Sequence, residues 1–346
     1  MECLEFGKME NGDIVNQYTL KNDSGMALGV LTYGGIIREL WVPDREGEMA
    51  DIVLGFNTLE DYIERNDPYF GCITGRVAGR TTGGKFTLEG VDYKFVLNDE
   101  PNHLHGGLEG LNRRVWKAKE LSENSIQLSY TSLDGDQGYP GNLEMSVIYT
   151  LTEENELRLE YHAKTDQATP ICLTNHSYFN LAGEDSGPVD EQTIQIFSDQ
   201  YVPTDEFLTL LGGVESVEGK ANDLRVPKTF GETIPNLHLE HGDNYMLKKA
   251  PSNELIPVAR TKDLKSGRVM DTLSTDNCLQ FYTGHFLDKD GLVVVGKSGD
   301  PYKAHAGYCL ECQGYPDGVN SPEIMDNILR PGERFQETTL YRFTTE

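Results

Sequence analysis

Basic residues and long apolar runs are scarce in this sequence. The 346 residues include 30 Lys and Arg against 56 Asp and Glu, a formal net charge of −26. Self-repulsion of that size aids solubility and argues against nucleic acid, a membrane surface or a polyanionic substrate as partner. No stretch approaches the apolar length that spans a bilayer, and the first residues, MECLEFGKMENGD, show no secretory pattern. We therefore expect a cytoplasmic protein.

Cysteines are few and scattered, and only Cys309 and Cys312 have a spacing typical of metal ligands. A structural zinc site would need a second such pair, which the sequence lacks. Without an export signal, the six cysteines are expected to be reduced, buried thiols, and this pair to lie on a strand.

Helical periodicity, internal repeats and Pro/Ser-rich linkers are also nearly absent. Only 58–65 (TLEDYIER) has the pattern of a short helix after a polar cap. Period-two alternation is widespread instead, and it predicts antiparallel hairpins around polar turns. These hairpins are 18–22 with 26–33, 86–88 with 91–95, 144–151 with 157–163, and 256–260 with 268–273. We expect an all-β fold, a large antiparallel β-sandwich with few short helices, as one domain over 1–346.

Three stretches combine imidazole, amide, acidic and aromatic side chains, a mixture that is costly to bury without partners. They are 173–181 (LTNHSYFNL), 102–107 (NHLHGG) and 308–320 (YCLECQGYPDGVN). A lone His176 would most often be a satisfied core histidine, but three such stretches in one chain indicate a polar cleft.

His103 and His105 would share a face of an extended strand, an H-x-H spacing that fits metal ligation, proton chemistry or hydroxyl binding. In 71–80 (GCITGRVAGR), Arg76 and Arg80 stand among small residues. An arginine that is buried there requires oxygen atoms as hydrogen-bond partners. For one of the two arginines, an ordinary charge at the protein surface is an equally good interpretation.

Strand alternation places Cys309, Glu311 and Gln313 on one face. A carboxylate on a mostly apolar strand should have a raised pKa, as a general base near neutral pH requires. Asp243 is by default a loop aspartate, whereas Gln280, polar within an apolar strand, is expected to face a ligand or buried backbone.

Taken in order, these motifs resemble the aldose 1-epimerase (galactose mutarotase) family over about residues 33–343. The resemblance is carried by DIVLGF, GRVAGR, NHLHGG, GDQGYPGNL, LTNHSYFNL, LQFYTG, CLECQGYPDGVN and RPGERF.

The resemblance implies a galactose mutarotase-like supersandwich and cofactor-free interconversion of the α and β anomers of free aldoses. Glu311 matches the general base that takes the proton of the anomeric hydroxyl, and His176 matches the acid that protonates the ring oxygen. His105 matches the second catalytic histidine.

The resemblance also implies that Arg80, Asp243 and Gln280 contact the sugar. The family usually has Asn at the position of Gly79 and Asp-His-Asn where this chain has Asp243-Asn244, so substrate preference is expected to differ. With an amide missing at position 79, the enzyme should tolerate variation at one ring hydroxyl.

Four alternatives use the same residues. A hexose-6-phosphate epimerase would need a cluster of basic residues near the pocket, and the motifs offer chiefly Arg76 and Arg80. A non-catalytic sugar-binding protein would be expected to lack His176 or Glu311. A metal-dependent enzyme would use His103 and His105, and a glycosidase would need two carboxylates. We expect no cofactor and no metal, a small sugar as substrate, and a monomer or homodimer.

Overall fold

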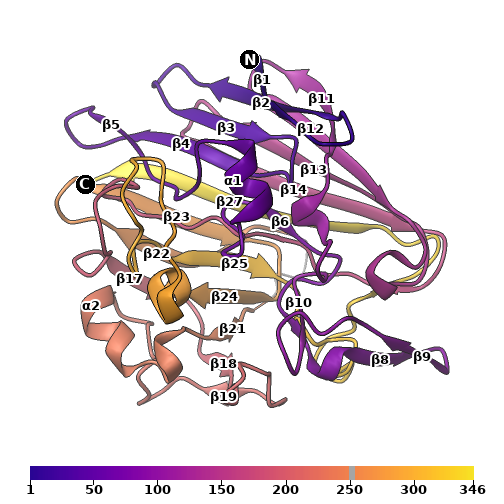
Figure 1. Cartoon of the computed structure of the whole chain (residues 1–346). Helices are drawn as coiled ribbons and strands as arrows, with labels where there is room; N and C mark the ends of the chain where they lie inside the picture. The colour runs from indigo at the N-terminus through magenta and orange to yellow at the C-terminus, as the bar shows by residue number, and fades with distance from the viewer. Residues whose placement is uncertain (249–253) are drawn as a thin grey trace.

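The computed structural model describes residues 1–248 and 254–346, and strands dominate it (Figure 1). The largest sheet has nine antiparallel strands. In spatial order they are β11 (Lys117–Ser122), β12 (Ser125–Ser132), β13 (Leu143–Leu151), β14 (Glu156–Thr165), β27 (Phe335–Thr345), β23 (Arg268–Ser274), β22 (Ile256–Lys262), β17 (Thr193–Ile196) and β20 (Lys228–Thr229).

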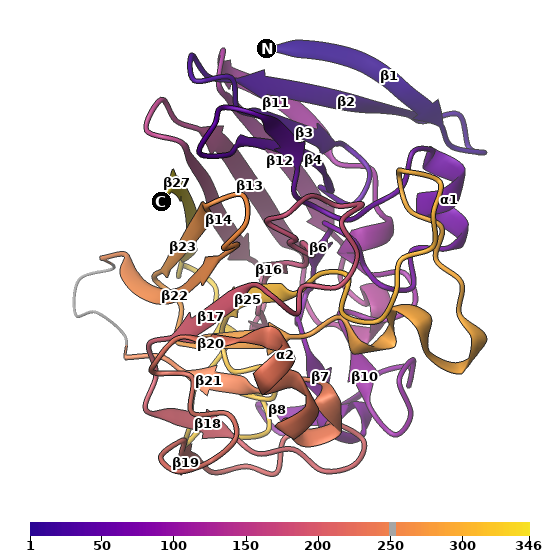
Figure 2. The same cartoon turned by 90° about the vertical axis from the view of Figure 1, so that its left-hand side faces the viewer.

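Two five-stranded antiparallel sheets pack beside it (Figure 2). One is β1 (Glu2–Lys8), β2 (Ile14–Lys21), β3 (Ala27–Leu31), β4 (Ile37–Pro43) and β5 (Met49–Asp51). The other is β19 (Glu215–Ser216), β18 (Gln200–Val202), β21 (Asn244–Met246), β24 (Cys278–Tyr282) and β25 (Cys309–Gln313).

Short pairs complete the framework around the second of these sheets. They are β7 (Arg80–Thr81) with β10 (His103–Leu104), β6 (Ile73–Thr74) with β16 (Thr174–Asn175), β8 (Lys85–Leu88) with β9 (Val91–Lys94), and β15 (Thr169–Pro170) with β26 (Ile328–Leu329). All four expected hairpins are present: β2–β3, β8–β9, β13–β14 and β22–β23.

The expected helix is α1 (Leu59–Glu64), and the side chain of Thr58 caps it by accepting from the amide of Asp61. A second helix, α2 (Phe230–Thr233), has no periodic signal because it is only four residues long. None of the helices in the described ranges is long and apolar enough to cross a bilayer.

The main core lies between the nine-stranded sheet and the two smaller ones. Along β13, alternate residues such as Val147 and Tyr149 are fully buried, and they belong to one cluster with Val30 from β3 and Leu310 from β25. Burial of one face of each sheet supplies the main stabilising term, about 25 cal/mol per Å² of apolar surface. The side chains on the opposite face of β25 therefore point away from this core.

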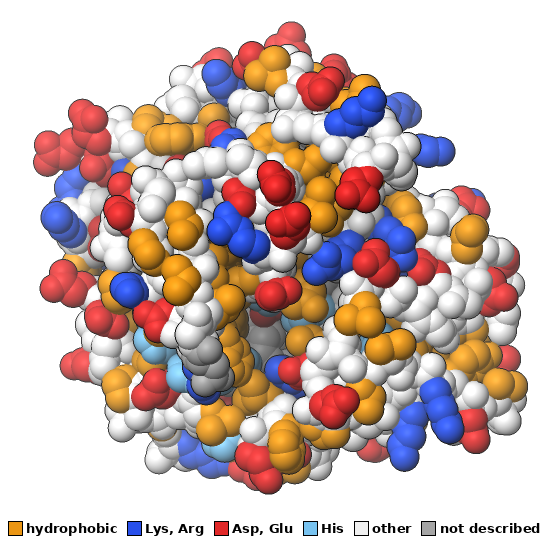
Figure 3. All heavy atoms as spheres, in the orientation of Figure 1, with side chains coloured by type: hydrophobic (Ala, Val, Ile, Leu, Met, Phe, Trp, Pro, Cys, Tyr) orange, Lys and Arg blue, Asp and Glu red, His pale blue; other side chains and the backbone are white. Residues whose placement is uncertain are grey.

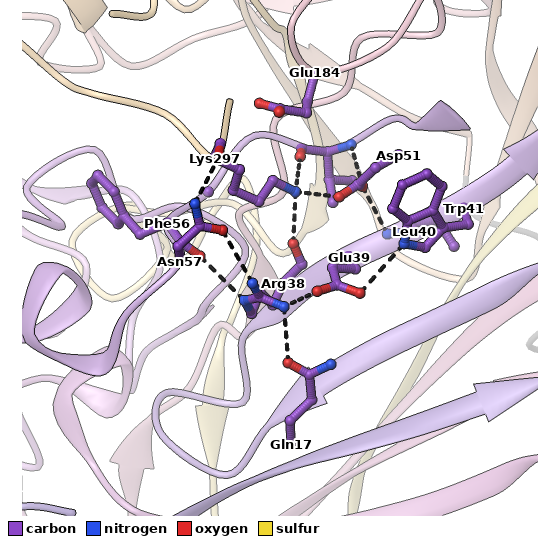
Figure 4. A network of polar contacts seen from close by, with 12 residues as sticks. Gln17, Arg38, Glu39, Leu40, Trp41, Asp51, Phe56, Asn57, Glu184 and Lys297 are labelled. Atoms are coloured by element: carbon purple, nitrogen blue, oxygen red, sulfur yellow. Dashed lines mark hydrogen bonds and ion pairs between the residues drawn. The ribbon is translucent and has the colours of Figure 1, made fainter. Parts of the chain in front are cut away.

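A buried lysine anchors the loop that follows β24. The Nζ atom of Lys297 donates to the carbonyls of Arg38 (2.9 Å) and Val53 (2.6 Å) and pairs with the Asp51 carboxylate at 2.5 Å (Figure 4). Its three donors are thus all satisfied, which a buried ammonium requires. The segment between β24 and β25 is thus fixed near its middle by this contact.

Candidate active site

The outer face of β25 presents a carboxylate to a deep cavity. Leu310 and Cys312 point into the main core, so strand alternation turns Glu311 and Gln313 the other way, as expected from the sequence. Glu311 is 2% exposed. Burial raises the pKa of Glu311 to about 8, and the guanidinium of Arg80 partly opposes that rise.

His176 faces this carboxylate from the chain just after β16. Its amide donates to Cys72 and its carbonyl accepts from Gly71, both at 2.9 Å, so the backbone is fixed on two sides. The Nε2 atom lies 3.6 Å from Oε1 of Glu311, and Nδ1 lies 3.6 Å from the Cys309 sulfur. Beside it, Asn175 donates to the Gly71 carbonyl and Ser177 donates to Oδ1 of Asn175, so these polar neighbours are satisfied around an imidazole that lines the cavity.

Burial acts on the two groups in opposite senses. It lowers the pKa of His176 to about 4 while it raises the pKa of Glu311 to about 8, because each loses solvation of its charged form. Between these values the pair holds one proton. Passing that proton from carboxyl to imidazole yields carboxylate and imidazolium without exchange with solvent.

His105 lies beside His176, with ring centroids 5.2 Å apart and nearly perpendicular planes. Its Nδ1 accepts a hydrogen bond from the amide of Gly79 at 3.1 Å, which leaves Nε2 to carry the hydrogen. Burial and the neighbouring His176 lower the pKa of His105 well below its usual value. His105 is therefore a neutral donor.

The expectation that His103 and His105 share a strand face is wrong. The strand β10 ends at Leu104, and His105 adopts a positive φ of 51°, which breaks the alternation. His103 points elsewhere: its ring nitrogens contact the Val96 carbonyl and the Tyr139 hydroxyl. The two imidazoles therefore do not form one ligand set.

The two arginines of 71–80 separate in the same way. Arg80 lines the cavity and pairs through Nε with the Asp99 carboxylate at 2.6 Å. Arg76 is 2% exposed and donates to five oxygens, including Oγ of Ser132 and the carbonyl of Pro140, so its role is structural. Arg76 therefore adds no positive charge to the cavity lining.

The cavity has a volume of about 310 Å³, the size of a small-molecule site. Figure 3 shows the molecule hollowed near the centre of this view, with histidine side chains visible around the hollow. Besides the polar groups, four aromatic side chains line it: Tyr69, Tyr178, Tyr282 and Phe286. Aromatic faces beside hydrogen-bonding groups suit a ligand with C–H faces and hydroxyl edges.

Gly79 meets the cavity only through its backbone. Its φ is +74°, and a Cβ here would lie 2.7 Å from Cβ of Pro316. A side chain at this position must displace the proline ring, so substitution by Asn would not simply add an amide to the cavity.

Gln280 lies in the cavity lining, as expected, and its Oε1 accepts from Nδ2 of Asn244 at 3.0 Å. Gln313 was named from the sequence only as a neighbour of Glu311 on the strand, yet it also lines the cavity. Its Oε1 atom is buried with no hydrogen-bond partner in the part of the chain that the structure describes. An orphaned acceptor is the kind of group that a ligand hydroxyl satisfies.

Asp243, expected at the site, does not line the cavity. In the β21–β24 ladder, Asn244 pairs with Gln280, so Asp243 falls on the opposite face. Its carboxylate accepts from Nδ2 of Asn222 at 3.1 Å, and burial raises the pKa of Asp243 to about 6. A displacement of one residue along the strand is enough to turn the side chain away.

His241 lines the cavity instead, with its ring tilted by 36° against that of Tyr282 and the ring centroids 4.6 Å apart. Its burial lowers the pKa of His241 to about 3. Strand alternation does not extend to His241, because the adjacent Gly242 has a φ of +104°. In the sequence, His241 is distinguished only by its place in the polar stretch 241–245 (HGDNY), which also contains Asp243.

Known proteins resemble this chain over nearly its whole length. The family model for aldose 1-epimerase matches residues 16–342. Galactose mutarotases from human and rat are 42% and 41% identical to it, each covering 98% of this chain and 97% of the relative. An Escherichia coli aldose 1-epimerase is 31% identical over 95% of both chains.

Solved structures agree with the sequence relatives. An aldose epimerase homologue from C. elegans superposes with a TM-score of 0.89 at 28% identity, covering 96% of this chain and 99% of its own. A galactose 1-epimerase from Lactobacillus acidophilus gives 0.83 at 26% identity, covering 99% and 98%. From the family match and this identity over nearly the full length, the chain belongs to the aldose 1-epimerase family, and it is an enzyme of that class.

Proposed function

We propose that this enzyme interconverts the anomers of free aldoses such as glucose and galactose, with Glu311 and His176 as its proton-transfer pair. The observation that carries the proposal is the carboxyl–imidazole pair, 3.6 Å apart at the cavity wall, whose two pKa values are about 8 and about 4. The pair shares one proton, which rests on Glu311 and passes to His176 to give the carboxylate and imidazolium that react.

The reaction requires proton transfer at two oxygens bonded to the same carbon, C1. The Glu311 carboxylate takes the proton of the anomeric hydroxyl, and the His176 imidazolium protonates the ring oxygen, so that the C1–O5 bond breaks. The open aldehyde rotates about C1–C2 and recloses from its other face while the two groups exchange roles. Because both oxygens are on C1, a close pair of groups can serve both.

The remaining lining groups would position the sugar. Neutral His105 donates from Nε2, Arg80 donates from its guanidinium, and Gln280 and Gln313 offer amides. The aromatic rings cover apolar faces of the pyranose. We assign no sugar contact to Asp243, since its carboxylate lies on the other face of the ladder.

A free sugar is favoured over a hexose 6-phosphate. Arg80 is the one basic Lys or Arg side chain in the described cavity lining, and it is already paired with Asp99. A phosphate would bring at least one further negative charge to a protein of net charge −26. The glycosidase alternative lacks support, since the other carboxylates in the described lining are Asp67, which is exposed, and Asp99, which is held by Arg80.

Polarimetry on freshly dissolved α-D-glucose and α-D-galactose tests the assignment. Glu311→Gln and His176→Asn should each lower kcat by about 10²–10⁴-fold, the usual contribution of a positioned acid or base. Both variants should remain folded, since each keeps a polar side chain of similar size. Near wild-type rates in either variant, after subtraction of spontaneous mutarotation, would remove that residue from its role.

The proposed chemistry needs no Lewis acid, so kcat should persist after dialysis against EDTA. We further propose that residues 1–346 act as one domain in the cytoplasm. The main core joins strands from both ends of the chain, and all six cysteines are free. A single calorimetric transition would support the single domain.

A further inference from the structure

Three metal-ligating side chains converge beside the cavity, outside the proton-transfer pair. Glu240 ends the 3₁₀ turn η5 (His238–Glu240), His285 begins η6 (His285–Gly291), and His305 precedes β25. Their ligand atoms all lie within 4.8 Å of one another. Oε2 of Glu240 is 3.5 Å from Nδ1 of His285 and 3.9 Å from Nε2 of His305.

Thr283 contacts two of these residues, one through its backbone carbonyl and one through its hydroxyl. Nδ1 of His305 lies 3.0 Å from the Thr283 carbonyl, which can only accept, so Nε2 of His305 is left with its lone pair toward Glu240. The Thr283 hydroxyl donates to the Glu240 carbonyl. An outer hydrogen bond that fixes the imidazole tautomer is the usual arrangement behind a metal-binding histidine.

His285 supplies an independent indication. Its Nδ1 is buried and makes no hydrogen bond within residues 1–248 and 254–346, although it faces the Glu240 carboxylate. A buried, unsatisfied nitrogen is costly, and a metal ion would satisfy it.

We propose that Glu240, His285 and His305 form a binding site for a divalent transition metal ion such as Zn²⁺. Two imidazoles and one carboxylate are the donors that Zn²⁺ favours, whereas Mg²⁺ and Ca²⁺ prefer oxygen alone. Zn²⁺ binds such ligands at about 2.0–2.2 Å, so the three atoms must draw closer. The Glu240 side chain is 49% exposed and free to move, and water can complete the coordination.

Lys289 opposes binding. Its Nζ lies 3.0 Å from Nε2 of His285, the nitrogen that must carry the hydrogen once Nδ1 binds a metal. The ammonium would then lose its acceptor and face a like charge. Lys289 is exposed and can swing away, so replacing it with Gln should tighten metal binding on the order of threefold to tenfold.

The site would connect two segments of the cavity wall. His241 follows Glu240 directly and Phe286 follows His285, and both line the cavity. A bound ion would tie these segments together at the position where Phe286, 41% exposed, reaches solvent. We expect the ion to alter KM, because it touches the wall, and to leave the Glu311–His176 chemistry in place.

The test is calorimetric titration of EDTA-treated full-length enzyme with ZnCl₂, followed by Co²⁺ absorption spectroscopy. The expected result is one ion per chain, with affinity at least about tenfold weaker in His285→Asn and in His305→Asn. Lys289→Gln should bind more tightly. His162→Asn, which removes a histidine of β14, should bind like wild type.

One further variant distinguishes this site from the active site. His105, His176 and Glu311 present the same ligand types within the same 4.8 Å limit. Binding that survives in His285→Asn and His305→Asn but disappears in Glu311→Gln would overturn the proposal, as would no binding at all to wild type. Because the readout is stoichiometry rather than turnover, an error in the proposed reaction would not imitate either result.

Discussion

The pH dependence of kcat/KM follows from the opposite pKa shifts of the proton-transfer pair. Glu311, raised to about 8, loses its proton as the pH rises through that value, and His176, lowered to about 4, gains one as the pH falls through it. Only the form of the pair with one proton has both an acid and a base. Activity should therefore be broad and flat between these limits, with two macroscopic pKa values that belong to the pair.

The acidic and basic limbs of the pH profile predict very different losses of kcat/KM between pH 5 and pH 9. At about pH 9, with an upper pKa of about 8, roughly one tenth of the enzyme keeps the single proton, so kcat/KM falls about tenfold. At about pH 5, with a lower pKa of about 4, roughly nine tenths keeps it, so almost nothing is lost. An exposed histidine with the usual pKa near 6.5 would instead cost most of the activity at pH 5.

Polarimetric initial rates at subsaturating sugar, corrected for the spontaneous reaction at each pH, measure this profile. Arg80→Gln should move the basic limb to higher pH, because the guanidinium lowers the pKa of Glu311. Arg114→Gln, which removes an arginine paired with Asp136 at 3.0 Å, is the matched control and should leave the limb in place. Activity that keeps rising through pH 9, or that falls with a midpoint near 6.5, would refute the assignment.

Three other outcomes follow. Gly79→Asn should destabilise the fold by about 1–3 kcal/mol through overpacking, measured by urea unfolding, whereas Gly90→Asn, with a φ of +81° but open space around it, is the control; equal costs would show that the neighbouring proline yields easily. Asp243→Asn should keep kcat/KM within about threefold and raise the Tm above pH 7, because the folded state then no longer holds a buried carboxylate of raised pKa; a large loss of affinity would return this residue to the sugar site. Glucose 6-phosphate should have a kcat/KM at least about 100-fold lower than that of glucose. The cavity offers the phosphate no free basic side chain, and the missing bidentate charged contact would contribute about a 100-fold gain in affinity. Comparable kcat/KM values for the two sugars would favour the phosphosugar alternative.

Local patterns in the sequence predicted the hairpins and the face of Glu311 correctly, because strand alternation is set by near neighbours. On β25 the alternation runs unbroken for five residues, and it places Glu311 against the cavity and Leu310 against the core. The expected polar cleft is also confirmed, since the cavity draws lining residues from all three polar stretches.

The failures share one physical cause, which is a break in alternation that depends on distant contacts. His105 leaves the strand at a positive φ where its backbone and ring exchange hydrogen bonds with Gly79. Asp243 follows Gly242, whose positive φ fits against the Phe281 carbonyl of a neighbouring strand. The local residue pattern does not reveal those distant partners. It therefore does not predict which way the side chains point after the break, and it does not identify His241 as a cavity residue.

The distribution of thiols gives the folded chain a simple chemical signature. The expectation that all six cysteines are buried is wrong for Cys3, which is exposed on the strand β1, whereas the other five sulfurs are buried. Burial raises the pKa of Cys309 well above its usual value, so the sulfur next to His176 resists reagents that attack thiolates. An alkylating dye should therefore modify one position in the native enzyme and six after denaturation. The gain of label in mass spectrometry then measures unfolding directly, molecule by molecule, without any need for substrate.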